Sequence, residues 1–121
     1  QANTMVAVSL SAQPEALTVL SASVARSLFL TTQEALANIA RHARATQVIV
    51  SIEQQDNNII LRISDDGYGF DMASKNYSIG HGLANMRARA KDLNGTFKIV
   101  SAPGQGTTIK LEVPIKKGSP A

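Results

Sequence analysis

The sequence predicts a two-layer α+β sandwich, in which a mixed, mainly antiparallel sheet is covered on one face by about three helices. Short β-rich segments occur in pairs joined by turn residues, and segments with helical spacing separate the pairs. With 121 residues, of which 44% are hydrophobic, the chain has enough apolar side chains for one core. We therefore expect a single domain over residues 1–115 and a flexible polar tail over residues 116–121.

The N-terminal part is expected to contain one strand and two helices. Residues 5–10 alternate in part between apolar and polar side chains, as a strand does. Pro14 is typical of a first helical turn, and apolar residues follow at helical spacing as far as Val24. Residues 27–43 give the clearest helical pattern, because helix formers dominate and neither Gly nor Pro interrupts them. We expect this helix to end near Ala45.

The C-terminal part is expected to contain two hairpins around a third helix. Alternating, β-branched segments predict the strands, and turn residues join them in pairs. The third helix is expected over residues 83–93, where Asn94-Gly95 provides a C-cap. The four expected strands are residues 48–53, 59–63, 96–100 and 107–113.

Composition excludes several classes of site. The chain has no cysteine, so disulfides, thiolate catalysis and Cys-based zinc sites are ruled out. The net charge of +3 suits a polyanionic ligand, but the basic residues are scattered and aromatics are few, which disfavours a nucleic-acid surface. Neither a membrane span nor a secretory signal is apparent, so we expect a cytoplasmic domain without direct membrane insertion, although a longer parent protein could be membrane-anchored.

The second expected helix carries the first group of candidate functional residues. Glu34, Asn38, Arg41 and His42 lie at i, i+4, i+7 and i+8, so they share one side of a helix. The amide oxygen of Asn38 suits Mg²⁺, Arg41 suits anionic oxygens, and Glu34 could orient or deprotonate a reacting group. Spacing alone favours an ordinary solvated helix face.

Residues 64–71 form the second group, directly after an expected strand. Asp65 and Asp66 are adjacent carboxylates, and an ionised carboxylate can accept a hydrogen bond from the exocyclic amine of a ligand. Gly67 and Gly69 would allow the backbone to approach a ligand closely. An Asp-Gly surface turn explains the same residues equally well. A calcium loop is excluded, because acidic residues are not at alternate positions.

Residues 80–90 form the third group, a glycine-flanked loop expected to lead into the third helix. A helix N-terminus offers unpaired N–H groups that suit phosphate, and Gly80 and Gly82 would let the backbone fold over an anion. The segment matches neither the P-loop pattern nor the dinucleotide-binding fingerprint. The glycines of residues 102–106 are explained most simply by a hairpin turn.

Taken together and in this order, these segments resemble the catalytic ATP-binding (GHKL) domain of bacterial two-component sensor histidine kinases, in particular the nitrate/nitrite-sensor and desaturase-sensor types. Residues 33–43 resemble the N box of the family, and residues 65–71, 80–90 and 104–108 resemble its three glycine boxes. The match covers about residues 25–115. The resemblance implies a Bergerat-type ATP-binding fold, ATP and Mg²⁺ as cofactors, and histidine kinase activity.

The resemblance also implies roles for the N-box residues. Asn38 would coordinate Mg²⁺, and Glu34 would be the acidic residue that assists phosphoryl transfer. Arg41 and His42 would face the phosphate or ribose side of the nucleotide.

The glycine boxes would form the rest of the nucleotide site. Asp65 would accept a hydrogen bond from the adenine amine, and Gly67 and Gly69 would shape that wall of the pocket. Thr107 would lie near adenine. The mobile lid over the triphosphate would contain Gly80, Gly82 and Leu83.

The sequence departs from the family pattern at one position and lacks one segment. Asp66 stands where the family usually has Asn, and its charge would weaken triphosphate binding unless it points away or is neutralised. The dimerisation helices with the phosphoacceptor histidine are absent from these 121 residues, and His42 lies in the N box. The expected partners are therefore a dimerisation domain and a response regulator of the full-length protein. An anti-sigma serine kinase, an ATPase of the same superfamily and a non-catalytic basic binding module remain as alternatives.

Overall fold

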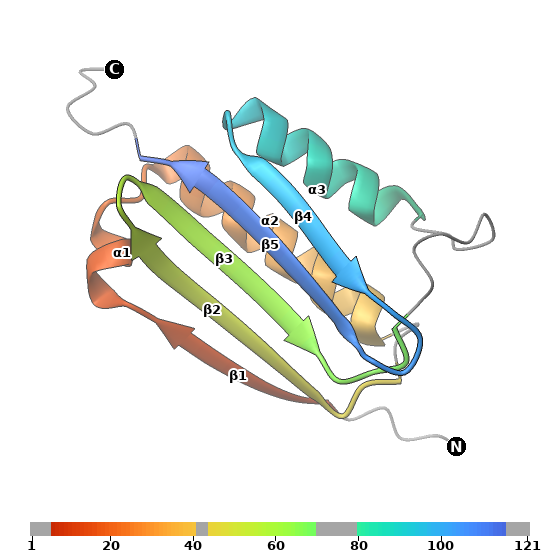
Figure 1. Cartoon of the computed structure of the whole chain (residues 1–121). Helices are drawn as coiled ribbons and strands as arrows, with labels where there is room; N and C mark the ends of the chain where they lie inside the picture. Colours follow the sequence, from red (N-terminus) through yellow and green to blue (C-terminus); the bar gives the residue numbers. More distant parts are fainter. Residues whose placement is uncertain (1–5, 41–43, 70–79, 116–121) are drawn as a thin grey trace.

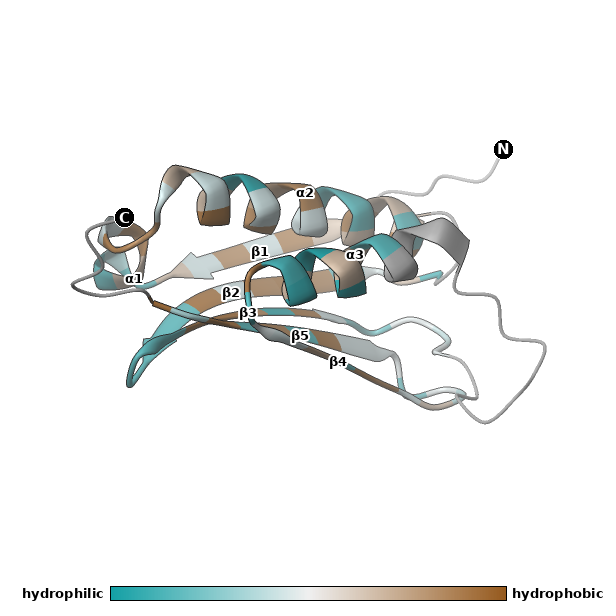
Figure 2. Ribbon diagram, turned by 90° about the horizontal axis from the view of Figure 1, so that it is seen from above, coloured by the Kyte–Doolittle hydropathy of each residue, from teal (hydrophilic) through white to brown (hydrophobic). Residues whose placement is uncertain are grey.

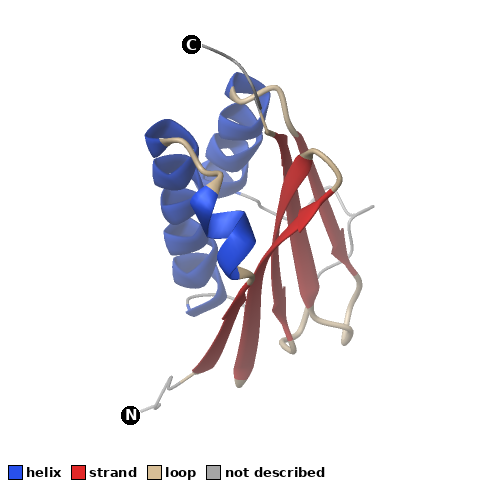
Figure 3. Ribbon diagram, turned by 90° about the vertical axis from the view of Figure 1, so that its left-hand side faces the viewer, coloured by secondary structure: helices blue, strands red, loops and turns tan. Residues whose placement is uncertain are grey.

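The computed structural model describes residues 6–40, 44–69 and 80–115 and confirms the expected two-layer sandwich. The strands form one sheet in the order β1-β2-β3-β5-β4, with β1 parallel to β2 and every other pair antiparallel. The helices cover one face of this sheet (Figure 3). The strands are β1 (Ala7–Ala12), β2 (Gln47–Gln55), β3 (Asn58–Asp65), β4 (Thr96–Ser101) and β5 (Thr107–Pro114), and the helices are α1 (Pro14–Thr18), α2 (Ala22–Asn38) and α3 (Gly80–Asp92).

Strand alternation separates an apolar face from a polar face. In β3, Ile59, Leu61 and Ile63 point into the core beneath the helices and are almost fully buried. The opposite face carries polar contacts, including an ion pair of Arg62 with Glu53 at 3.3 Å. In Figure 2, hydrophobic segments alternate with paler or hydrophilic ones along the strands. Most of the burial is on the helix-covered face, as is typical of an antiparallel sheet with one solvated face, but Ile60 on the opposite face of β3 is also only 1% exposed.

Two helix boundaries differ from the sequence prediction. Helix α2 begins at Ala22 rather than at Ser27, because the Ser21 hydroxyl accepts a hydrogen bond from the Val24 amide at 3.2 Å and caps the helix. Val24 therefore belongs to α2, and the preceding helix α1 ends at Thr18. At the other end the α-helical part of α2 ends at Asn38, and Ile39 and Ala40 continue it as a wider helical turn. Residues 41–43 lie outside the described range, and Arg44 has a φ of 54°.

The remaining boundaries are closer to expectation. Helix α3 begins at Gly80, three residues before the expected start, so the predicted glycine loop is wrong for this part of the backbone. The predicted C-cap is confirmed: Asn94 has a φ of 59°, and the Gly95 amide donates to the Ala90 carbonyl at 2.8 Å. The predicted tail, residues 116–121, lies outside the described residues.

Candidate functional site

One end of the sandwich collects the segments that the sequence analysis singled out. The C-terminal end of α2, the end of β3 and the β4–β5 turn lie at the lower right of Figure 1, and the beginning of α3 lies at the right above them. Helices α2 and α3 run antiparallel over the sheet, which is why the end of one meets the beginning of the other. Residues far apart in sequence therefore meet at one edge of the core.

A polar row forms the sheet side of this site. Asp65 lies opposite Thr107, and Thr107 lies opposite Ser101, so the three residues occupy one level across β3, β5 and β4. The hydroxyls of Ser101 and Thr107 are 2.8 Å apart. Asp65 follows Ile63 by two residues, so its side chain is on the helix-covered face, as is the apolar core. The row is thus the polar rim of the core.

The surroundings of Asp65 have opposing effects on its carboxyl. Partial burial raises the pKa of Asp65 above the ordinary 3.8, and the neighbouring Asp66 charge adds to that rise. The Gly67 amide, which donates to Asp65 Oδ1 at 2.8 Å, and the Thr107 backbone both act to lower the pKa. Burial has the largest effect. Asp65 is therefore a half-buried acceptor at the end of a strand.

The carboxylate of Asp66 is bound by two residues where β2 begins. It accepts hydrogen bonds from the Thr46 amide at 2.9 Å, the Thr46 hydroxyl at 2.7 Å and the Gln47 amide at 3.0 Å. The Thr46 hydroxyl bond, followed by the two backbone bonds, lowers the pKa of this exposed group. Asp66 thus ties the segment after β3 to the segment before β2, and its charge is matched by three donors.

Two glycines are required by contacts within the protein itself. Gly69 has a φ of 67°, and a Cβ there would lie 2.2 Å from the Ala102 carbonyl oxygen. Gly106 has a φ of 73°, and a Cβ there would lie 2.1 Å from the Asp65 carbonyl oxygen. At Gly69 the close neighbour is the β4–β5 turn of the protein itself, whereas the predicted approach to a ligand stays a prediction. These two glycines let the turn pack against the segment that carries Asp65.

The helix side of the site contains Glu34 and Asn38, one turn apart on α2. Both are partly exposed. Glu34 forms an ion pair with Arg89 of α3, with Oε1 2.5 Å from Nη1, and its Oε2 accepts from the Asn85 amide at 3.2 Å. Asn85 and Arg89 were not among the site residues predicted individually from the sequence. Their i, i+4 spacing on α3 marks them as one face, but their partner on α2 becomes visible only in the fold.

Several predicted site residues are described only in part. Gly80, Gly82 and Leu83 are in the first turn of α3, for which the structure describes the backbone alone. Arg41 and His42 lie outside the described residues. Within the described ranges, no group of three or more His, Cys, Asp or Glu residues is arranged to hold a metal ion. In the same ranges, no helix is both long and apolar enough to cross a bilayer.

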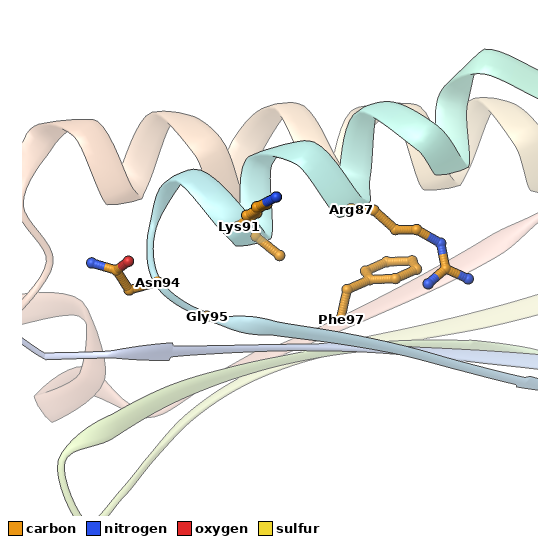
Figure 4. Close-up of a pocket in the computed structure, with 6 residues that line it drawn as sticks. Arg87, Lys91, Asn94, Gly95 and Phe97 are labelled. Carbon is orange, nitrogen blue, oxygen red and sulfur yellow. The ribbon is translucent and has the colours of Figure 1, made fainter.

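A shallow pocket of about 440 Å³ lies elsewhere, between the C-terminal half of α3 and β4. Arg87 extends over the Phe97 ring, with 5.2 Å between the guanidinium carbon and the ring centroid, whereas Asn94 points away (Figure 4). None of the predicted site residues lines this pocket.

Comparison with known proteins identifies the family. The family model described as histidine kinase-, DNA gyrase B- and HSP90-like ATPase matches residues 23–117. The chain belongs to this family. That range contains all the predicted site residues and agrees with the resemblance inferred from the four boxes.

Two relatives of the chain are sensor proteins. The sensor protein VraS of Staphylococcus epidermidis is 43% identical over 90 residues, covering 74% of this chain and 26% of VraS. VraS of Staphylococcus aureus gives the same identity and coverage. The chain therefore spans about a quarter of the length of these relatives.

The structural neighbours support the fold. The histidine kinase AdeS of Acinetobacter baumannii superposes with a TM-score of 0.73 at 19% identity, covering 94% of this chain and 56% of that one. The histidine kinase domain of a blue-light activated kinase from Erythrobacter litoralis gives 0.71 at 20% identity, covering 92% and 53%. The five-stranded sheet and its helical layer are thus an architecture shared with histidine kinases.

Proposed function

We propose that this chain binds ATP with Mg²⁺ and donates the γ-phosphate to a histidine on a separate dimerisation domain of a longer, cytoplasmically acting sensor kinase. A response regulator would then receive the phosphoryl group. One observation carries the proposal: the half-buried acceptor Asp65 and the amide of Asn38 belong to elements that meet at one end of the sandwich, on the same face of the sheet. The ATPase family to which the chain belongs supports it.

The base end of the site is formed by Asp65. Its ionised carboxylate accepts hydrogen bonds only, so it pairs with the exocyclic amine of adenine. Guanine presents a carbonyl oxygen at the corresponding position, and two facing acceptors repel one another. Gly67, Gly69 and Thr107 form the walls around this contact, and the Gly67 amide, which donates to Asp65, keeps the carboxylate oriented. This arrangement favours adenine over guanine.

The metal end of the site is assigned to Asn38. The described residues provide an amide oxygen there rather than a cluster of carboxylates, which suits an ion that arrives with a triphosphate. Mg²⁺ takes oxygen ligands, retains several waters and is commonly shared between one or two protein groups and phosphates. When bound, it would neutralise charge that develops on the transferring phosphoryl group. Arg41 and His42 are assigned to the phosphate or ribose side.

Glu34 is assigned to phosphoryl transfer itself. It lies one helical turn before Asn38 and would orient, or accept a proton from, the attacking histidine. Phosphoryl transfer demands little covalent work from the protein, so positioning and charge neutralisation dominate. Gly80, Gly82 and Leu83 are assigned to the segment that covers the triphosphate.

Calorimetric titration tests the binding part of this proposal. We expect ATP and ADP to bind in a Mg²⁺-dependent manner, with GTP much weaker. Asp65→Ala should abolish the preference for ATP over GTP, whereas the exposed control Asp92→Ala should retain it. Equal binding of ATP and GTP by the parent chain would contradict the role of Asp65. Salt-sensitive nucleic-acid binding without any ATP affinity would instead support a basic binding module.

Phosphotransfer to a supplied dimerisation domain tests the catalytic part. We expect Asn38→Ala to abolish Mg²⁺-dependent transfer with the fold intact, and the turn variant Asn57→Ala to transfer normally. Transfer to the histidine by Asn38→Ala at the parental rate would refute the assigned role. Transfer to a serine of a supplied protein, but not to histidine, would identify a serine kinase of the same family.

A further inference from the structure

Helices α2 and α3 are joined by a cluster of three side chains, of which Asn85 and Arg89 have no part in the proposed reaction. Both oxygens of the Glu34 carboxylate are engaged by α3, one by Arg89 at 2.5 Å and the other by Asn85 at 3.2 Å. The Arg89 and Glu34 side chains are only 23% and 29% exposed, so water competes weakly for this contact. We call these three residues the α2–α3 clamp.

The position of the clamp links the two ends of the phosphate site. The two helices are antiparallel, and Glu34 of α2 contacts Asn85 of α3. The position one turn after Glu34 on α2 therefore lies beside the position one turn before Asn85 on α3. Four helical residues correspond to about 6 Å along the axis. The first of these positions is Asn38, and the second falls within the glycine-bearing first turn of α3. The clamp therefore lies one turn away from both segments.

The buried contacts between α3 and the sheet are apolar, in contrast to the polar contacts of the clamp. Met86 and Ala90 bury the underside of α3 against the core, and these apolar contacts hold the helix against the sheet without a directional bond along its axis. A bidentate contact between Glu34 and two residues one turn apart resists sliding along this axis, because movement along either helix breaks one of the two hydrogen bonds.

We propose that Arg89, assisted by Asn85, is a positioning residue that sets the axial register of α3 relative to Asn38 and thereby sets the affinity for the triphosphate. This inference rests on the proposed function and adds to it two residues of α3 that hold no nucleotide atom themselves. The base end, formed by Asp65 on the sheet, lies outside the clamp. Loss of the clamp thus weakens phosphate binding and leaves adenine binding unchanged.

Parallel titrations with Mg-ATP and with adenosine test this inference. We expect Arg89→Met to weaken Mg-ATP binding about tenfold, in the usual range of couplings between sites, and adenosine binding by less than about twofold. Arg89→Lys should recover part of the loss, because lysine supplies the charge without the planar fork of arginine. Asn85→Ala should show a smaller loss of Mg-ATP affinity in the same direction.

Arg87 provides the matched control on the same helix. Its guanidinium stacks over the Phe97 ring of β4, so Arg87→Met should leave both affinities within about twofold of the parent. Thermal melting of each variant checks that the fold persists. If Arg89→Met does not fold, Arg89→Lys and Asn85→Ala carry the same comparison.

Two results would overturn the inference while the proposed function stands. One is Mg-ATP affinity in Arg89→Met within twofold of the parent. The other is an equal loss of adenosine and Mg-ATP affinity, which indicates general loosening of the site. A parent chain that binds neither ligand would contradict the proposed function itself, and the inference would fall with it.

Discussion

Gly106→Ala perturbs the contact that positions Asp65, and Gly104→Ala provides its control. Both glycines lie in the β4–β5 turn with positive φ, 73° for Gly106 and 77° for Gly104. They differ in what a methyl group would meet. At Gly104 nothing lies within 4 Å, whereas at Gly106 a Cβ would be 2.1 Å from the Asp65 carbonyl oxygen and 3.1 Å from its carbonyl carbon. The pair therefore separates backbone strain from steric overlap.

The magnitudes follow from these two terms. An alanine held in left-handed backbone costs about 1–2 kcal/mol, and this applies to both variants. Overpacking against backbone that must shift adds about 1–3 kcal/mol, and this applies to Gly106→Ala alone. We expect Gly104→Ala to lose about 1–2 kcal/mol and Gly106→Ala about 2–5 kcal/mol. Because the overlap displaces Asp65, Gly106→Ala should also weaken ATP binding.

Urea unfolding measures the difference. For a small domain the free energy of unfolding changes by about 1–3 kcal/mol per molar urea, so the midpoints of the two variants should differ by roughly 1 M. Equal midpoints would refute the reasoning, because the strain common to both glycines would then explain everything. Unchanged ATP affinity in a folded Gly106→Ala would show that the contact does not position Asp65.

Three further predictions concern single side chains. The buried hydroxyl of Thr31 has no hydrogen-bond partner, so Thr31→Val should leave stability unchanged or raise it by about 1 kcal/mol in thermal melts, and a clear loss would reveal a hidden partner. The pKa of Asp66 is lowered in the folded chain, so the unfolded chain binds that proton more readily, and stability falls as the pH drops below the ordinary 3.8. The Asp66→Asn variant should be less stable than the parent near neutral pH, and its stability should depend less on pH in acid. Parallel profiles of stability against pH would contradict this. Burial raises the pKa of Asp65, so as the pH is lowered ATP affinity should already begin to fall before pH 3.8 is reached. Calorimetry of Asp65→Asn should show no such step.

Most of the fold could be predicted because its signals are local. Alternating β-branched residues gave four strands within two or three residues of their observed ends, and Asn94-Gly95 ended α3 as expected. Helix starts were less accurate, since Ser21 caps α2 at a position where the apolar pattern is weak. The strand order and the pairing of β1 with β2 depend on long-range contacts that no local pattern encodes.

The candidate site was predictable in outline but not in its contacts. Asp65 and Thr107 were expected at one adenine pocket, and the register places them opposite one another. Their neighbours were not foreseen. The charge of Asp66 is matched by Thr46 and Gln47, and Glu34 is held by α3, because both arrangements join segments distant in sequence. Such partners depend on how the layers pack, which single-residue chemistry does not specify.

Nuclear magnetic resonance of the labelled chain during a Mg-ATP titration tests most directly whether Asn38 and Asp65 border one nucleotide site. We predict saturable shifts of the Asn38 side-chain amide and of the Gly67 backbone amide, which reports on Asp65, with a single dissociation constant for both. Replacing Mg²⁺ with Mn²⁺ should broaden the Asn38 signal more strongly than the Gly67 signal. Shifts confined to the pocket around Arg87 and Phe97, with Asn38 and Gly67 unchanged, would contradict the account.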